Sequence, residues 1–187
     1  MKNVFYWSPF VSKVATVTAV MNSAESINKR SKKTGFVASV IDAIEEWSEF
    51  KEILDKKKIS IIKINKPPII NVFNNYGFIK SRLTYWYIFI RSFFSLHNLI
   101  KKRKPEYLII HLITSLPIFL FIFNKYQTKL ILRISGLPRM TLLRKLLWKL
   151  ASKKIFKITC PTYDTYKDLS KFEFMKDKLV VLKDPVL

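Results

Sequence analysis

The sequence contains a single cysteine, Cys160, among its 187 residues. One thiol excludes an internal disulfide and leaves no thiolate cluster that would bind zinc. Cys160 ends an apolar run, and no histidine stands near it in the sequence to activate it. We therefore expect a buried, inert thiol in a reducing, cytoplasmic compartment rather than a nucleophile.

Glycine and acidic residues are also scarce. Only three glycines are present, and neither common type of glycine-rich phosphate loop occurs. Against 13 Asp and Glu stand 34 Lys and Arg, which gives a net charge of +21 and a pI near 10.1. Such a surface attracts anions of any kind, including nucleic acid, anionic lipid and phosphorylated substrates. Part of the Lys, Ile, Phe and Asn excess is typical of AT-rich genomes.

The acidic residues that do occur form one dense group, Asp42, Glu45 and Glu46. This group lacks the histidines or further carboxylates that a metal site at this spacing requires. We interpret it as a solvated strand end, and we expect no metal site.

Apolar side chains, in contrast, are abundant: 49% of the residues are hydrophobic and 14% are aromatic. A disordered basic arm or a nucleic-acid tail has less apolar surface, and no RNP-like or helix-turn-helix pattern is present. An anionic membrane surface is therefore the preferred partner, and no nucleic acid is expected. A chain of this length forms one domain with a sizeable core.

Apolar runs alternate with segments of helical periodicity along the chain. Short buried strands are predicted at residues 3–7, 36–41, 59–64, 107–110, 129–134, 155–160 and 178–182. Helices are predicted at residues 16–33, 46–57, 79–101 and 140–153, with Gly35 ending the first and a later helix capped by Thr162 or Asp164. This alternation predicts an α/β fold, a Rossmann-like parallel sheet of about six to seven strands with helices on both faces.

The helix predicted at residues 140–153 has two unlike faces. Leucines recur at helical spacing and predict a face buried on the sheet: Leu142, Leu143, Leu146, Leu147 and Leu150. The opposite face has Arg144, Lys145, Lys149 and, among them, Trp148. We expect this indole either under another domain or at a membrane surface, beside the cations.

Two further segments are unusually apolar. The helix at residues 79–101, with Trp86 and Arg91, is either buried in the core or lies in a membrane interface, where aromatic rings and flanking cations are favoured. Residues 108–123 belong to an apolar run of about 17 residues, the lower limit for a membrane span. Against a span stand its polar residues and Pro117, which fit a strand, a loop and a buried helix with proline in the first turn.

Four stretches of the sequence resemble a known family: ISGLPRM at 134–140, LLRKLLWKL at 142–150, ITCPTYDT at 158–165 and LKDPVL at 182–187. They are similar to the N-terminal domain of family 4 glycosyltransferases of the GT-B architecture, most specifically at 135–138, 160–165 and 184–187. The resemblance implies that residues 1–187 are a single GT-B N-terminal half, on the acceptor side. It also implies that the C-terminal donor-binding domain, which holds the nucleotide sugar, is absent. On that reading this chain has no cofactor of its own and is inactive alone.

The resemblance also implies a candidate site, at the carboxyl ends of the strands where open α/β sheets bind ligands. In the family a histidine near the end of the fourth strand contacts the acceptor or donor sugar, and His111 has this position. The first loop of the family faces the cleft and often has a glycine where this sequence has Ala15. Arg139 is the expected anion contact, because a forked guanidinium suits phosphate. The acceptor-binding candidates are Ser8, Lys13, Thr16, His111, Ser135, Gly136, Arg139 and Thr162.

The membrane-surface candidates are Trp86, Arg91, Arg144, Lys145, Trp148 and Lys149. The leading hypothesis is a glycosyltransferase acceptor-binding domain in cell-surface polysaccharide or glycolipid synthesis, peripheral on the inner face of the cytoplasmic membrane. Its expected partners are a lipid-linked or saccharide acceptor, an anionic membrane surface and a C-terminal glycosyltransferase domain or subunit. The alternative is a basic membrane-surface interaction protein without chemistry.

Overall fold

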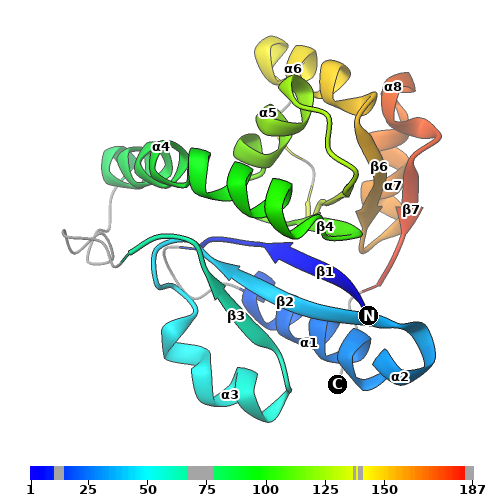
Figure 1. Cartoon of the computed structure of the whole chain (residues 1–187). Helices are drawn as coiled ribbons and strands as arrows, with labels where there is room; N and C mark the ends of the chain where they lie inside the picture. Colours follow the sequence, from blue (N-terminus) through cyan, green and yellow to red (C-terminus); the bar gives the residue numbers. More distant parts are fainter. Residues whose placement is uncertain (11–14, 67–77, 137, 139–140, 184–187) are drawn as a thin grey trace.

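The computed structural model describes residues 1–10, 15–66, 78–136, 138 and 141–183. Its strands form one seven-stranded sheet in the order β3-β2-β1-β4-β5-β6-β7, and each neighbouring pair is parallel (Figure 1). The strands are β1 (Lys2–Trp7), β2 (Phe36–Asp42), β3 (Ser60–Lys63), β4 (Tyr107–Ile110), β5 (Lys129–Arg133), β6 (Ile155–Cys160) and β7 (Leu179–Val181). This is the predicted α/β fold with a Rossmann-like sheet.

Helices cover both faces of the sheet (Figure 1). One face has α1 (Ala15–Lys29), α2 (Ser31–Thr34), the short η1 turn (Ser48–Phe50) and α3 (Lys51–Lys56). The other has α4 (Phe78–Arg103), α5 (Ser115–Phe123), α6 (Leu142–Ser152), α7 (Tyr163–Ser170) and α8 (Glu173–Lys176). The division follows from right-handed crossovers, because the chain moves outwards from β1 to β3 and then in the opposite direction from β4 to β7.

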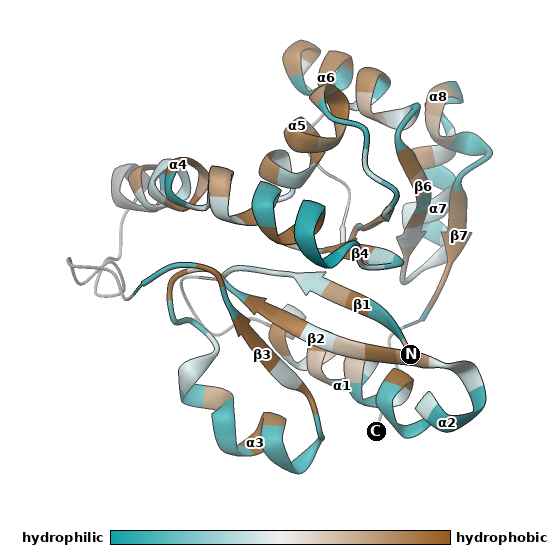
Figure 2. Cartoon of the chain, in the orientation of Figure 1, coloured by the Kyte–Doolittle hydropathy of each residue, from teal (hydrophilic) through white to brown (hydrophobic). Residues whose placement is uncertain are grey.

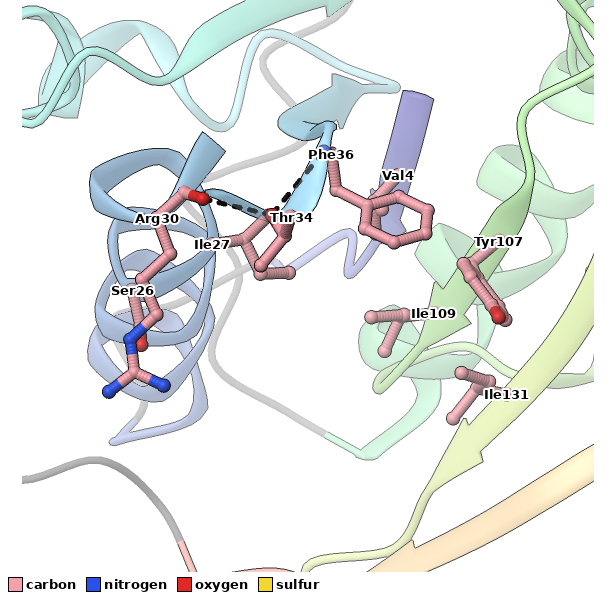
Figure 3. A pocket seen from close by; sticks show the side chains of 9 residues that line it. All are labelled: Val4, Ser26, Ile27, Arg30, Thr34, Phe36, Tyr107, Ile109 and Ile131. Atoms are coloured by element: carbon pink, nitrogen blue, oxygen red, sulfur yellow. Dashed lines mark hydrogen bonds between the residues drawn. The ribbon is translucent and has the colours of Figure 1, made fainter. Parts of the chain in front are cut away.

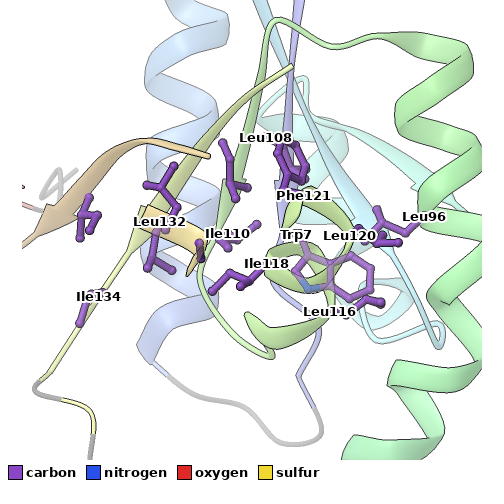
Figure 4. Packing of buried hydrophobic residues seen from close by; sticks show 14 of the residues in the cluster. Trp7, Leu96, Leu108, Ile110, Leu116, Ile118, Leu120, Phe121, Leu132 and Ile134 are labelled. Carbon is purple, nitrogen blue, oxygen red and sulfur yellow. The ribbon is translucent and has the colours of Figure 1, made fainter. Parts of the chain in front are cut away.

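The sheet separates two hydrophobic cores, since successive side chains of a strand point to opposite faces. Trp7 of β1 lies in the core beneath α4 and α5, where Leu96, Leu116 and Ile110 are also buried (Figure 4). Tyr6 of the same strand lies in the other core, against α1. Each fully buried large side chain contributes about 1.5–3 kcal/mol to folding. The two cores therefore hold the strands, and with them the loops at the strand ends, in place.

Several predicted boundaries are confirmed. The predicted strands at residues 107–110 and 155–160 are β4 and β6. Gly35 ends the first helical region, and its φ of 73° is in the left-handed range that favours glycine. The helix predicted at 16–33 is in fact two helices, α1 and α2, separated at Arg30.

The apolar run at residues 108–123 is divided between β4 and α5, and Pro117 is in the first turn of α5 as predicted. Among the described residues no helix combines the length and apolarity that crossing a membrane requires. Cys160 is buried, its Sγ donates a hydrogen bond to the Val180 carbonyl at 3.7 Å, and burial raises the pKa of the thiol. The prediction of a buried thiol is confirmed.

The orientation predicted for α6 is wrong. Leu142 is 89% exposed and Trp148 only 6% exposed, so the leucines face outwards and the indole faces the core. Ala151 and Ser152 share the buried side with Trp148, because they follow it by one helical turn. These small residues let α6 approach α5 and α8, and burying one indole removes a large apolar area from water. Figure 2 colours much of α6 as hydrophobic, although the leucines of this helix are exposed.

Candidate functional site

The carboxyl ends of the parallel strands meet at one edge of the sheet, which we name the carboxyl edge. Ser8 follows β1, His111 follows β4, and Ser135 and Gly136 lie just after β5. β1, β4 and β5 are neighbours, with Trp7 paired to Ile110 and Ile110 paired to Leu132. The fold thus brings the segments that begin at Ser8, His111 and Ser135 to adjacent positions, as the parallel sheet predicts.

His111 and Ser8 are neighbouring buried polar residues at this edge. The His111 backbone N–H donates a hydrogen bond to the Trp7 carbonyl at 3.0 Å, which places it beside Ser8. Ser8 is fully buried and His111 is 8% exposed. Among the described residues, neither the Ser8 Oγ nor either ring nitrogen of His111 has a hydrogen-bond partner. Buried polar atoms are nearly always paired, so these three atoms mark a place where a polar ligand or water completes the bonding.

The imidazole of His111 is neutral. Burial, with a smaller effect from the charge of Arg133, lowers the pKa of His111 to about 3. Its ring centroid lies 6.0 Å from that of Tyr6, whose own pKa burial raises to about 12. A neutral imidazole has one donor and one acceptor nitrogen, which suits the hydroxyl of an uncharged ligand. This site can hold and orient such a group.

Arg133 is a member of the site that the sequence did not indicate. It is buried at the end of β5, and its Nη1 donates a hydrogen bond to the Leu182 carbonyl at 3.0 Å. The guanidinium therefore joins β5 to the segment after β7. A single cation inside an apolar strand forms no recognisable sequence motif. Ile110 pairs with Leu132, and His111 and Arg133 are the residues that follow them, so the strand register places Arg133 beside His111.

The interpretation of Asp42, Glu45 and Glu46 as a solvated strand end is wrong for two of the three residues. Asp42 and Glu46 are buried. Glu46 accepts hydrogen bonds from the N–H groups of Ala43 at 3.0 Å and Ile44 at 2.7 Å. Burial and the adjacent Asp42 carboxyl raise the pKa of Glu46 well above its usual range. Within the described residues neither carboxyl oxygen of Asp42 has a hydrogen-bond partner, so Asp42 and Glu46 are two adjacent carboxyl groups buried at the end of β2.

The remaining acceptor-binding candidates have different surroundings. Thr16 is half-buried in the first turn of α1, while Ser135 and Gly136 are exposed. Thr162 is the N-cap of α7, and its hydroxyl accepts from the Thr165 N–H at 3.2 Å, which is a structural role. Lys13 and Arg139 lie outside the described residues.

A separate hollow of about 330 Å³ lies beside α1 (Figure 3). Its walls include Val4 and Tyr107, which are near the amino ends of their strands. The lining is mostly apolar, and the Thr34 hydroxyl on its rim donates to the Arg30 carbonyl at 3.0 Å. None of the predicted site residues lines this hollow. Within the described part of the chain no three His, Cys, Asp or Glu residues gather to hold a metal ion.

The membrane-surface candidates are only partly exposed. Trp86 is 57% exposed, and Arg144, Lys145 and Lys149 are exposed as well. Arg91 is half-buried and donates to the Lys66 carbonyl at 2.7 Å. Trp148 is buried, so it is removed from this set.

Comparison with protein-family models and with curated proteins gives no match. Among solved structures, UDP-GlcNAc 2-epimerase from Neisseria meningitidis bound to UDP-GlcNAc matches at 17% identity, with a TM-score of 0.64. A glycosyltransferase from Rickettsia africae matches at 14% identity with a TM-score of 0.63, and MnaA of S. aureus with UDP at 14% and 0.64. The chain has the fold of one GT-B half.

This GT-B half is matched almost completely, but its counterparts are longer. The three matches cover 97% of this chain and 46%, 42% and 44% of the respective solved chains. The chain thus spans less than half the length of the proteins it matches.

Proposed function

We propose that the chain is the acceptor-side half of a nucleotide-sugar-dependent glycosyltransferase of the family 4 type, in cell-surface polysaccharide or glycolipid synthesis. The observation that carries this proposal is the match of 97% of the chain to 42% of a glycosyltransferase. His111 supports it, because its unpaired nitrogens at the carboxyl edge suit saccharide hydroxyls, which both donate and accept hydrogen bonds.

The sheet itself supports the need for a second domain. Parallel sheets are normally covered on both faces. On the α1 face, Phe156 of β6 is 44% exposed and Val180 of β7 is 39% exposed. We assign donor binding to the second domain, with the nucleotide sugar as its ligand. Transfer requires both substrates aligned in a closed cleft, so this half alone is expected to be inactive.

A second candidate is half of an enzyme that modifies the nucleotide sugar itself. Several structures described as UDP-GlcNAc 2-epimerases match with TM-scores from 0.59 to 0.64. Both candidates require a nucleotide sugar, but only the glycosyltransferase requires an acceptor. The reaction product therefore distinguishes them.

The experiment measures UDP release from UDP-sugars with a lipid-linked saccharide as acceptor. It compares the chain alone with the chain co-expressed with the polypeptide encoded immediately downstream. We expect transfer only with both polypeptides and the acceptor, and we expect the downstream sequence to be a second Rossmann-like domain with paired glutamates. Transfer by the chain alone contradicts the proposal. Epimerisation without acceptor supports the second candidate, and lipid binding without any turnover supports the non-catalytic alternative.

The two histidines provide a matched pair of variants. His111→Gln should lower kcat/KM for the acceptor by about tenfold or more, because a buried polar contact is lost. His97→Gln is the control, because His97 does not lie at the carboxyl edge. Its ring forms a hydrogen bond of 2.7 Å with the Tyr126 hydroxyl, between α4 and the segment before β5. Equal losses in the two variants would contradict a substrate contact at His111.

A further inference from the structure

α4, α5 and α6 form a layer whose outer side is apolar. The exposed large apolar side chains of this layer are Leu83, Trp86, Ile90 and Phe94 of α4, Phe119 and Phe123 of α5, and Leu142, Leu143, Leu146 and Leu150 of α6. We name them together the α4–α6 outer surface. Isolated exposed apolar residues are common in proteins, but a contiguous set of this size indicates a binding surface.

Contacts between the helices show that this surface is continuous. The Phe119 ring of α5 lies 6.1 Å from Phe93 of α4 and 4.6 Å from Phe123. The Tyr85 hydroxyl of α4 contacts the Ser115 hydroxyl at the start of α5. α5 in turn packs against α6, so it joins the two outer helices of the layer. The exposed leucines of α6 therefore extend the aromatic area of α4 and α5.

The charge on these helices has one sign. α4 contains six Lys or Arg and α6 contains three, whereas α4, α5 and α6 contain no Asp or Glu. Between Asp55 and Asp164 the sequence has one acidic residue, Glu106, which Lys2 and Lys129 bind at 3.3 Å and 2.8 Å. The helices that form the outer surface thus combine exposed apolar side chains with charge of positive sign alone.

The charge pattern selects among possible occupants of the surface. A second copy of the chain would bring two cationic surfaces together, which is unfavourable. An anionic bilayer satisfies both features, because leucine and aromatic side chains enter the headgroup boundary while lysine and arginine meet the lipid phosphates. Tryptophan such as Trp86 is favoured at that depth.

We propose that the α4–α6 outer surface binds anionic lipid bilayers, with the leucines of α6 and the aromatic side chains of α4 inserted at headgroup level. This proposal goes beyond sugar transfer and does not depend on it. Leu142 and Leu143 begin α6, shortly after the Ser135–Gly136 turn of the carboxyl edge. A bilayer bound here lies next to that edge, where a lipid-linked ligand would arrive.

The test is flotation of the purified chain with phosphatidylglycerol vesicles and with phosphatidylcholine vesicles. One variant combines Leu142→Gln, Leu146→Gln and Leu150→Gln, and a second combines Trp86→Ala with Phe94→Ala. The matched control combines Ile53→Gln with Val180→Gln, because these apolar residues are exposed outside the α4–α6 outer surface. All of the substituted residues are exposed, so each variant should unfold at nearly the temperature of the unmodified chain, which thermal unfolding checks.

We expect binding to phosphatidylglycerol vesicles alone, falling as salt is raised. Each surface variant should lower the partition coefficient by about tenfold or more, and the control should leave it unchanged. Equal binding to neutral vesicles, or an equal loss in the control, overturns the proposal. So does a dimer in sedimentation that the leucine substitutions abolish while no vesicle binding is seen, because the surface would then belong to a second copy.

Discussion

α1 and α6 are both amphipathic helices of the same domain, but only α1 buries the apolar stripe that its sequence shows. α1 buries its apolar residues, including Val17, Val20 and Met21. α6 buries Trp148 with two small residues and exposes its leucines. α1 packs on β2, whereas α6 packs between α5 and α8. An apolar stripe therefore shows which side of a helix is hydrophobic, while the neighbouring elements decide which side is buried.

The largest expected effect is a difference in the free energy of unfolding between substitutions in the apolar faces of α1 and α6. Val20→Lys in α1 places an unpaired charge in the core and should destabilise the protein by about 5 kcal/mol or more. Leu146→Lys in α6 should change the free energy of unfolding by less than about 0.5 kcal/mol. Urea denaturation followed by circular dichroism measures both. Comparable losses would mean that the leucines of α6 are buried after all.

The next effect concerns the indole that α6 buries. Trp148→Ala should cost about 3–5 kcal/mol, because it leaves a large cavity beneath the helix. Trp86→Ala, at an exposed tryptophan of α4, is the control and should cost much less. Chemical denaturation compares the two variants. A small loss of stability at Trp148 together with a large loss at Leu146 would mean that α6 buries its leucines and exposes its indole.

Two groups on the α1 face of the sheet should respond to acid in different pH ranges. Glu25 of α1 has a lowered pKa because it binds Lys57 and Lys29, so its contribution is present above pH 4.5 and is lost below that value. His111, whose ring lies beside Tyr6 on the same face, has its pKa lowered from 6.5 to about 3, so its contribution is already lost progressively as the pH falls from 6.5. Between pH 6.5 and 5 this loss amounts to about 2 kcal/mol.

Glu46 acts in the opposite direction, because its raised pKa makes the protein less stable as the pH rises above 4.5. The measurement is therefore the difference between the unmodified chain and His111→Gln at pH 6.5 and at pH 5, in which the contribution of Glu46 cancels. The unmodified chain should lose stability relative to the variant over this interval. Parallel curves would show that His111 is accessible to protons in the folded state.

The smallest effect tests how α6 begins. The Thr141 hydroxyl accepts a hydrogen bond from the Arg144 N–H at 3.4 Å and caps the helix. Thr141→Ala should cost about 0.5–1 kcal/mol. The comparison is Thr162→Ala at the cap of α7, where the bond is shorter and the loss should be somewhat larger. If Thr141→Ala costs as much as Trp148→Ala, the cap rather than the indole holds α6 in place.

The strands could be predicted from the sequence because buried parallel strands are short apolar runs between turn signals, as at β4. The rule for open α/β sheets then placed Ser8 and His111 at one edge. Tertiary packing decided the rest. Which side of α6 is buried depends on α5 and α8, and the burial of Glu46 depends on a turn with a φ of 66° at Glu45. Neither feature leaves a periodic pattern in the sequence.

The placement of the acidic residues has an electrical consequence. Seven of the 13 lie between Glu25 and Asp55, around α1 and α3, whereas α4, α5 and α6 have none. Eight Lys and Arg between Glu25 and Lys58 offset these seven carboxyl groups, so this region is nearly neutral, whereas α4 and α6 together have nine cations. The positive charge is thus distributed unevenly, and the molecule has a permanent electric dipole. Within a Debye length of about 8 Å at physiological salt, the field of an anionic surface exerts a torque on this dipole. The molecule is turned during its approach, so that the α4–α6 side is the first to arrive.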